Sequence, residues 1–299
     1  MAFRVRNIVS VSPSSHSIFA LNAAINKHKC FTLFATKSPI LGTWIRNQFC
    51  TDQSIPKLEE DSKANQEFLK WCNGGGKFHK SACIHPTAVI EVGAIVHSQA
   101  LVGENVHVGS GAIVGPAVKI GESTILGYNI SLSNCCIGNS CVIHNGVCIG
   151  QDGFGFLVDE QGNMVKKPQN LKAKIGNHVE IGSNTCIDRG SWRDTTVGDH
   201  SKIDNLVQIG HNVTIGRSCM ICGQVGIAGS VTIGDYVTLG GRVAIRDHVN
   251  IASKVRLAAN SCVTKDIIQP GDYGGFPAMP IAKWRRQVAL GNRTLDKQN

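Results

Sequence analysis

The chain has 299 residues, enough for one large domain or two of ordinary size, and it carries a formal net charge of +9. Only 6% of the residues are aromatic and 33 are glycine. This composition fits closely stacked backbones, because glycine tolerates positive φ and close approach. A charge of this size would favour a nucleic-acid-binding protein if it were spread over a folded domain, but its location in the chain argues against that function.

The first 51 residues hold most of the excess positive charge. They contain no Asp or Glu, several serines, and six basic residues: Arg4, Arg6, Lys27, Lys29, Lys37 and Arg46. Without these six, 24 basic residues remain against 21 acidic ones, a net charge of only +3. A basic, serine-containing and acid-free segment is typical of an organellar transit peptide, which we predict over residues 1–50. We therefore expect no nucleic-acid partner.

The expected destination is the mitochondrion, because Arg46 lies just before Phe49 and Cys50, a suitable neighbourhood for cleavage. A chloroplast is the alternative. No run of apolar residues approaches the roughly 20 needed to cross a membrane, so we expect no membrane span.

Residues 51–80 are predicted to form a helical linker. A short polar helix is expected from Leu58 to Trp71, ending at the three glycines Gly74, Gly75 and Gly76.

From Ile84 onward, an aliphatic residue falls at every sixth position, with three interruptions. A period of six is neither the 3.6 of a helix nor the 2 of an ordinary strand, and it is typical of a parallel β-helix. Three hexapeptides would close one triangular coil of about 18 residues, with the aliphatic residue pointing inward at each bend. We therefore predict an all-β fold, a hexapeptide-repeat β-helix over residues 81–268, with about nine coils. The positions are Ile84, Ile90, Val96, Val102, Val108, Val114, Ile120, Leu126, Leu132, Ile137, Ile143, Ile149, Ile175, Ile181, Ile187, Val197, Ile203, Ile209, Ile215, Ile221, Ile227, Ile233, Leu239, Ile245, Ile251, Leu257 and Val263.

The repeat stops after Val263, and residues 269–299 are predicted to be an extension that ends in a short α-helix. Ile281, Trp284, Val288 and Leu295 would share one face of this helix, and the basic residues Lys283, Arg285, Arg286 and Arg293 surround it. The helix is either a solvated cap over the last coil or a landing surface for an acidic protein.

The interruptions place a candidate site. Since three hexapeptides form one coil, every third inward residue lies at the same corner of the prism. One such column is Ile149, Ile187, Ile209, Ile227 and Ile245. The long insertion, residues 150–174, leaves directly after the first of these, and the short insertion, residues 188–196, leaves after the second. His211, Gly229 and His248 follow just past the same corner in successive coils. Because function tends to reside on loops carried by a rigid scaffold, we predict a site there.

The twelve cysteines do not suggest a disulfide framework or a metal site. Cys135 and Cys136 are adjacent, and Cys219 and Cys222 form a CxxC motif without a second pair. Several others occupy repeat positions where a small apolar residue packs well, namely Cys141, Cys148, Cys186, Cys219 and Cys262. We expect buried small hydrophobic residues and no metal.

Three segments carry a family resemblance: GQDGFGF at 150–156, VEIGSNTCIDRGSWRDTTVGDHSKIDNLVQIGHNVTIG at 179–216, and AGS at 228–230. They resemble the bacterial UDP-3-O-acylglucosamine N-acyltransferases of lipid A biosynthesis, over about residues 81–285. The resemblance implies a left-handed parallel β-helix and a homotrimer with active sites between subunits. It also implies transfer of a 3-hydroxyacyl chain from acyl carrier protein to the 2-amino group of a UDP-sugar, with no metal or redox cofactor.

The resemblance also implies roles for individual residues. His211, in QIGHNV, matches the general base of the family. The backbone N–H of Gly229 is expected to donate to the oxyanion, and the side chain of His248 is expected to contact the oxyanion or the acyl chain. Asp204 and Gln208 are expected to hold the sugar. Phe154 and Phe156, on the long insertion, could stack on the uracil base or form a small core of their own.

Two departures from the family pattern leave parts of this expectation open. The bacterial members carry a substantial N-terminal domain that contacts the uridine, whereas only about thirty residues here separate the predicted transit peptide from the first coil. We therefore expect uridine recognition to be weaker or supplied by other residues. Asn260 and Cys262 lie where residues that measure the acyl chain are expected, and they differ from the bacterial ones, so acyl length stays open.

Four alternatives remain from the sequence. A sister enzyme acylating a sugar hydroxyl shares the fold, but GQDGFGF and the spacing from Gly229 to His248 favour the amine-acylating branch. The acceptor could be another amino sugar. A γ-type carbonic anhydrase would need three histidines around zinc, two of them a few residues apart, and His211 has no such neighbour. A non-catalytic β-helix trimer is the fourth possibility.

Overall fold

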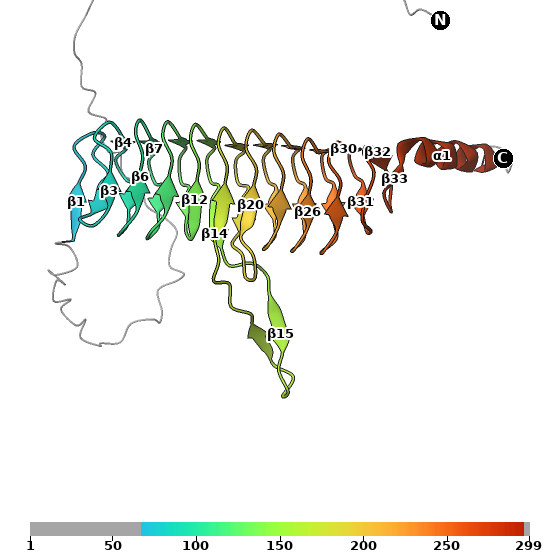
Figure 1. The fold of residues 1–299 in the computed structure, drawn as a ribbon, viewed down its shortest axis with the longest axis horizontal. Helices are drawn as coiled ribbons and strands as arrows, with labels where there is room; N and C mark the ends of the chain where they lie inside the picture. Colours follow the sequence, from blue (N-terminus) through green and yellow to red (C-terminus); the bar gives the residue numbers. More distant parts are fainter. Residues whose placement is uncertain (1–66, 296–299) are drawn as a thin grey trace, which may run out of the picture. The chain divides into compact units, whose positions relative to one another are not determined.

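The computed structural model describes residues 67–295, with side chains described to residue 290, and all of these residues belong to one compact unit. Figure 1 shows a stack of triangular coils followed by one helix. Three parallel sheets form the faces of the prism, with eleven, eleven and nine strands. Strands pair with the strand one coil away, as in Gln208 with Gly226 and Gly226 with Ala244, which confirms the period of 18 residues. The predicted parallel β-helix is therefore confirmed.

The strands of each sheet follow in the order of the stack. The first sheet contains β1 (Phe68–Lys70), β2 (Lys77–His79), β5 (Ile95–Val96), β8 (Ile113–Val114), β11 (Ser131–Leu132), β14 (Cys148–Gln151), β19 (Cys186–Asp188), β22 (Gln208–Ile209), β25 (Gly226–Ile227), β28 (Ala244–Ile245) and β31 (Cys262–Val263). The second sheet contains β4 (Val89–Ile90), β7 (His107–Val108), β10 (Ile125–Leu126), β13 (Val142–Ile143), β18 (Glu180–Ile181), β21 (Lys202–Ile203), β24 (Met220–Ile221), β27 (Thr238–Leu239), β30 (Val255–Leu257), β32 (Gly271–Gly274) and β33 (Met279–Pro280). The third sheet contains β3 (Cys83–Ile84), β6 (Leu101–Val102), β9 (Lys119–Ile120), β12 (Cys135–Ile137), β17 (Ala173–Ile175), β20 (Thr195–Val197), β23 (Thr214–Ile215), β26 (Thr232–Ile233) and β29 (Asn250–Ile251).

The core of the prism is filled by two residues of each hexapeptide, not one. The predicted aliphatic position is buried, as at Ile209, and the residue two positions before it, here Val207, is buried as well. Between the inward residues, the chain turns each corner through a residue with positive φ, such as Leu206 at 59° and Asn212 at 63°. The sequence period therefore located the core correctly but found only half of its residues.

The stack is longer than the nine coils expected, at about eleven turns. The aliphatic repeat in the sequence begins at Ile84. However, β2, which precedes Ile84, already pairs in parallel with β5 and adds to the stack. At the other end, β32 pairs with β30 and extends the second sheet past Val263.

The prediction of a helix from Leu58 to Trp71 is wrong for residues 67–71, the part of this range that the structure describes. Residues 68–70 form β1, which pairs antiparallel with β2. Trp71 follows this strand, donates its indole N–H to the Ala88 carbonyl at 2.9 Å, and packs edge-on against Phe78. Tertiary packing on the first coil thus overrides the local helical preference of this segment. The predicted transit peptide and the rest of the linker lie outside the described residues.

The C-terminal helix is present as α1 (Ile281–Leu295) and contacts β32 and β33. Residues 282–290 are all exposed, and among them Trp284 lies against the backbone of Gly275. Within residues 67–295, no helix has the length and apolar character needed to cross a membrane.

The cysteines agree with the sequence interpretation only in part. The ten described cysteines are all free, and Cys135, Cys141 and Cys219 are buried as small core residues. Cys148, Cys186 and Cys262 are half-buried instead, because they occupy the outward position of their strands in the first sheet.

Candidate functional site

The predicted column of isoleucines exists in the first sheet. Ile149 pairs with Ile187, which pairs with Ile209, and the register continues through Ile227 to Ile245. The long insertion leaves after β14 and forms the hairpin of β15 (Phe156–Val158) and β16 (Met164–Lys166), which projects from the stack in Figure 1. Both insertions therefore start at one corner of the prism, as the period predicted.

A cavity of about 620 Å³ lies at this corner. It is lined by the base of the hairpin and by three successive coils, through Asp152, Gly153, Phe154, Phe156, Lys166, Asp188, Gln208, Gly210, His211, Ile227, Ala228 and Gly229.

His211 is half-buried between two glycines. A Cβ added to Gly229 would lie 2.8 Å from both Cε1 and Nε2 of the imidazole, and a Cβ added to Gly153 would lie 2.7 Å from Cβ of His211. A side chain at either position would therefore displace His211.

The side chain of Asn212 fixes the tautomer of His211. Asn212 is fully buried, and its Nδ2 donates to the carbonyl of Arg193 at 2.7 Å, which orients the amide. Its Oδ1 is then the acceptor that faces His211 Nδ1 at 2.6 Å, and Ser191 Oγ donates to the same atom at 2.9 Å. Since Oδ1 can only accept, Nδ1 of His211 carries a hydrogen, and in the neutral imidazole the lone pair is on Nε2.

The short insertion holds this arrangement in place. Arg193 donates from Nε to the carbonyl of Asn212 at 2.7 Å, and its second guanidinium nitrogen bonds Ser230 O, Val231 O and Thr232 Oγ1. Trp192 stacks against the guanidinium, whose carbon lies 4.7 Å from the ring centroid. One arginine thus ties the insertion to the two coils that carry His211 and Gly229.

The cavity contains a buried carboxylate, Asp188, which is 8% exposed. Its Oδ1 accepts hydrogen bonds from Gln151 Nε2 at 2.9 Å and from Gln208 Nε2 at 3.3 Å. Burial raises the pKa of the Asp188 carboxyl, although the two glutamine hydrogen bonds and the charge of His211 act in the opposite direction.

A second carboxylate, Asp152, lies at the exposed rim of the cavity. It pairs with Lys166 of β16 at 2.5 Å and more weakly with Arg189 at 3.8 Å. The pair with Arg189 joins the long insertion to the short one.

The structure brings together five of the seven predicted site residues. His211, Gly229, Gln208, Phe154 and Phe156 all line the cavity. His248 does not: its side chain is exposed, and its backbone N–H donates to the Gly229 carbonyl at 3.1 Å.

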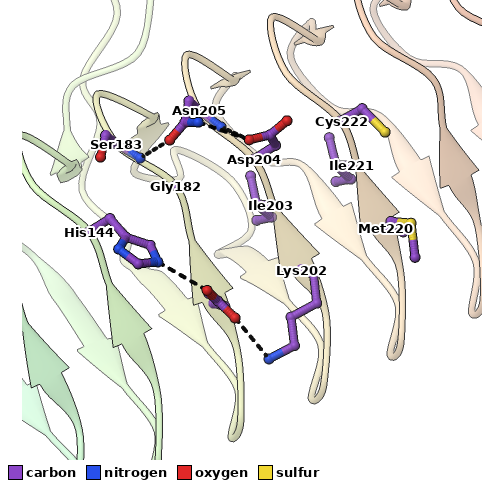
Figure 2. A pocket seen from close by; sticks show the side chains of 11 residues that line it. His144, Gly182, Ser183, Lys202, Ile203, Asp204, Asn205, Met220, Ile221 and Cys222 are labelled. Atoms are coloured by element: carbon purple, nitrogen blue, oxygen red, sulfur yellow. Dashed lines mark hydrogen bonds and ion pairs between the residues drawn. The ribbon is translucent and has the colours of Figure 1, made fainter. Parts of the chain in front are cut away.

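Asp204 lies at a different face of the prism. It lines a second pocket of about 550 Å³ on the second sheet, shown in Figure 2. There His144 Nε2 lies 3.0 Å from Glu180 Oε1, and Lys202 lies 3.6 Å from the other oxygen of the same carboxylate. Asp204 itself accepts from the backbone N–H of Asn205 at 2.7 Å.

Sequence reasoning missed Asp188, Asn212 and Arg193. Asp188 had a usable signal: it directly follows an inward isoleucine, where Ile149, Ile209 and Ile227 are followed by Gly or Ala. The sequence carries no such signal for Asn212 and Arg193, because their roles depend on contacts between the short insertion and two later coils. Among residues 67–295, no cluster of three His, Cys, Asp or Glu side chains is arranged to hold a metal ion.

Comparison with known proteins agrees with this fold. Residues 194–229 match the family model of the bacterial transferase hexapeptide (six repeats). A probable UDP-3-O-acylglucosamine N-acyltransferase 2, mitochondrial, from Arabidopsis thaliana is 71% identical over 221 residues, which are 74% of this chain and 73% of the relative.

Bacterial relatives match a shorter part. The UDP-3-O-acylglucosamine N-acyltransferase of Rhizobium meliloti is 52% identical over 163 residues, 54% of this chain and 46% of the relative, so the chain spans about half the length of the bacterial relatives it matches. Among solved structures, the UDP-N-acetylglucosamine acyltransferase of Francisella novicida superposes with a TM-score of 0.52 at 27% identity, covering 68% of this chain and 69% of the other. The chain therefore belongs to the UDP-3-O-acylglucosamine N-acyltransferase family.

Proposed function

We propose that this chain moves a 3-hydroxyacyl group from acyl carrier protein to the 2-amino group of UDP-3-O-acylglucosamine, giving UDP-2,3-diacylglucosamine in lipid A-type biosynthesis. The observation that carries the proposal is the imidazole of His211. Its Nδ1 faces Asn212 Oδ1, and its Nε2 lies against Gly229 in a cavity flanked by both insertions. The family membership supplies the substrate class.

The chemistry needs a base, because an ammonium group cannot attack a thioester. Nε2 of His211 takes a proton from the amino group, and the nitrogen lone pair then attacks the thioester carbon. As the tetrahedral intermediate collapses, the C–S bond breaks, and the imidazolium returns the proton to the leaving sulfur. The second proton that the nitrogen loses passes to water. No cofactor enters this scheme, since the acyl thioester is itself a co-substrate.

The oxyanion of the intermediate needs a fixed donor. The N–H groups on either side of Gly229 are occupied, with Ala228 donating to Ile245 O and Ser230 donating to His211 O. Within the described part of the chain, no acceptor is bonded to the N–H of Gly229 itself. We assign this N–H as the oxyanion donor, and His248, one coil further along, as a contact for the oxyanion or the acyl group.

The sugar nucleotide would lie along the outer wall of the cavity. Phe154 is 85% exposed and its ring contacts Phe156 at 5.0 Å, so an aromatic surface is available for the uracil base. Gln208 lies on the floor beside His211. Asp204 could reach the same ligand only from a neighbouring subunit, because its own pocket is on the second sheet.

A homotrimer with cavities between subunits is therefore part of the proposal. The hairpin of β15 and β16 exposes apolar side chains, including Leu157 at 58% and Val158 and Met164 at 66% each. A two-stranded hairpin is marginally stable by itself, and a neighbouring subunit would cover it. Light scattering on the purified protein should give three times the chain mass, and a monomer would contradict this arrangement.

Acyl carrier protein is acidic, and α1 offers a suitable surface. Residues 281–295 contain no Asp or Glu but four basic residues: Lys283, Arg285, Arg286 and Arg293. We place the carrier there. We also place the protein in mitochondria, because the Arabidopsis relative is named as mitochondrial and residues 1–50 have the composition of a transit peptide.

The decisive experiment measures acyl transfer from 3-hydroxyacyl carrier protein to UDP-3-O-acylglucosamine with wild-type protein and with His211→Ala. We expect the variant to keep its melting temperature and to lose about 10²- to 10⁴-fold in rate. His85→Ala, at an exposed turn in an early coil, is the matched control and should keep full activity. An unchanged rate in His211→Ala would remove the base assignment, and a stable trimer without any transfer would favour a scaffold.

A further inference from the structure

Asp188 is a buried carboxylate that the scheme above does not use. It follows Ile187 at the end of β19 and lines the same cavity as His211. Carboxylates are rarely buried unless they are paired. None of the ion pairs within residues 67–295 includes Asp188, and the adjacent Arg189 pairs with Asp152 instead.

Asp188 and its neighbour leave two acceptor atoms without donors. Both hydrogen bonds to Asp188 end on Oδ1, so within the described residues Oδ2 receives none. Gln151, which donates one of these bonds, has a buried Oε1 that also lacks a partner. Unsatisfied buried acceptors are rare in folded proteins. Asp188 lines the cavity, so its Oδ2 offers a charged acceptor to a ligand there.

The negative charge on this acceptor favours an ammonium group as its ligand. An ammonium carries three N–H donors and a positive charge, whereas a hydroxyl carries one donor and no charge. Hydrogen bonds between charged partners are about twice as strong as neutral ones. Asp152 cannot supply the same recognition, because it lies at the rim and is already paired with Lys166.

We propose that Asp188 recognises the amino group of the acceptor and makes the site select an amine over a hydroxyl, an inference that rests on the proposed function. The ammonium donates one N–H to Asp188 Oδ2 and presents a second to His211 Nε2, which removes that proton. The nitrogen then attacks and the C–N bond forms. When the tetrahedral intermediate collapses, the C–S bond breaks and the proton on His211 passes to the thiolate. The second proton lost by nitrogen leaves to water.

The test is calorimetric binding without an acyl donor, using two probes that differ at one atom. They are UDP-3-O-(3-hydroxyacyl)glucosamine and its 2-hydroxy counterpart, UDP-3-O-(3-hydroxyacyl)glucose. We expect the wild-type protein to bind the amine at least about 10-fold more tightly. Asp188→Asn, which keeps the size and the Oδ1 acceptor, should weaken amine binding by about 10- to 100-fold and leave the hydroxyl probe within about twofold. Glu104→Gln, at an exposed turn of an early coil, is the control and should bind both probes as the wild type does.

Two outcomes would overturn the assignment. Equal wild-type affinities for both probes would do so without any variant, so the result does not depend on the folding of Asp188→Asn. If folded Asp188→Asn protein bound both probes more weakly, and by the same factor, Asp188 would only support the local structure. Failure of the proposed function gives a different result: selective amine binding through Asp188 with no acyl transfer would reject the reaction and keep the recognition.

Discussion

The imidazole of His211 lies against the backbone of Gly229, the residue 18 positions further along the chain, so closely that a Cβ on Gly229 would be 2.8 Å from Nε2. This contact joins the proposed base to the proposed oxyanion donor. It follows from the coil length, because residues 18 apart occupy equivalent positions in adjacent coils.

Gly229→Ala should displace the imidazole and reduce the acyl-transfer rate by about 10²-fold, because a displacement of about 1 Å at a reacting group has this effect. The backbone at Gly229 has no positive φ, so the melting temperature should change little. Gly226→Ala is the steric control, since a Cβ there meets no atom within 4 Å. Wild-type turnover in Gly229→Ala would mean that the imidazole does not act from its present position.

Asn212→Gly should reduce kcat by about 10- to 100-fold with little change in KM, because losing the partner of Nδ1 allows the inactive tautomer of His211. Glycine suits this position because Asn212 has a φ of 63°. Asn212→Asp retains an acceptor and should keep more activity. Nitrogen-15 chemical shifts of His211 supply the check: one tautomer with Nδ1 protonated in the wild type, and a mixture in Asn212→Gly. Asn129→Gly, at a similar φ of 54°, is the control and should leave both kcat and the chemical shifts of His211 unchanged.

Asp188→Asn should raise the melting temperature at pH 7, by about 3 °C if it relieves roughly 1 kcal/mol in a protein of this size. The pKa of Asp188 is raised by burial in the folded state, so the folded protein binds this proton more tightly than the unfolded chain. The charged carboxylate therefore destabilises the fold above its raised pKa, and this penalty vanishes below the unfolded value of about 3.9. Asp152 adds to the shift, while His211 opposes it. Thermal melts from pH 3.5 to pH 7 provide the measurement, and a variant less stable than the wild type at pH 7 would contradict the argument.

Reversing the charges of Arg285 and Arg286 on α1 to glutamate should raise the KM for acyl carrier protein in a manner that weakens with added salt, because exposed charges are screened. The kcat at saturating carrier should stay near the wild-type value. Lys119→Glu, an exposed charge on the third sheet, is the control. An unaffected KM would favour a helix that serves only as a cap.

Several features of this protein follow from its sequence alone. The period of six determines the register, because residues one coil apart stack. It therefore predicts the single column of Ile149, Ile187, Ile209, Ile227 and Ile245. The same arithmetic brought His211 and Gly229 together at the corner where both insertions begin. Local periodicity suffices here, because each coil contacts mainly its neighbours.

Tertiary structure alone decided what surrounds His211. The orientation of Asn212 depends on the carbonyl of Arg193, whose guanidinium in turn spans two later coils. The burial of Asp188 depends on Gln151, 37 residues earlier in the chain. The hairpin places Gly153 on His211 although no repeat governs its path. Loop conformations and buried hydrogen bonds arise from packing between residues far apart in sequence, so no local pattern encodes them. For the same reason Trp71, which packs on the first coil, follows a strand where the sequence favoured a helix.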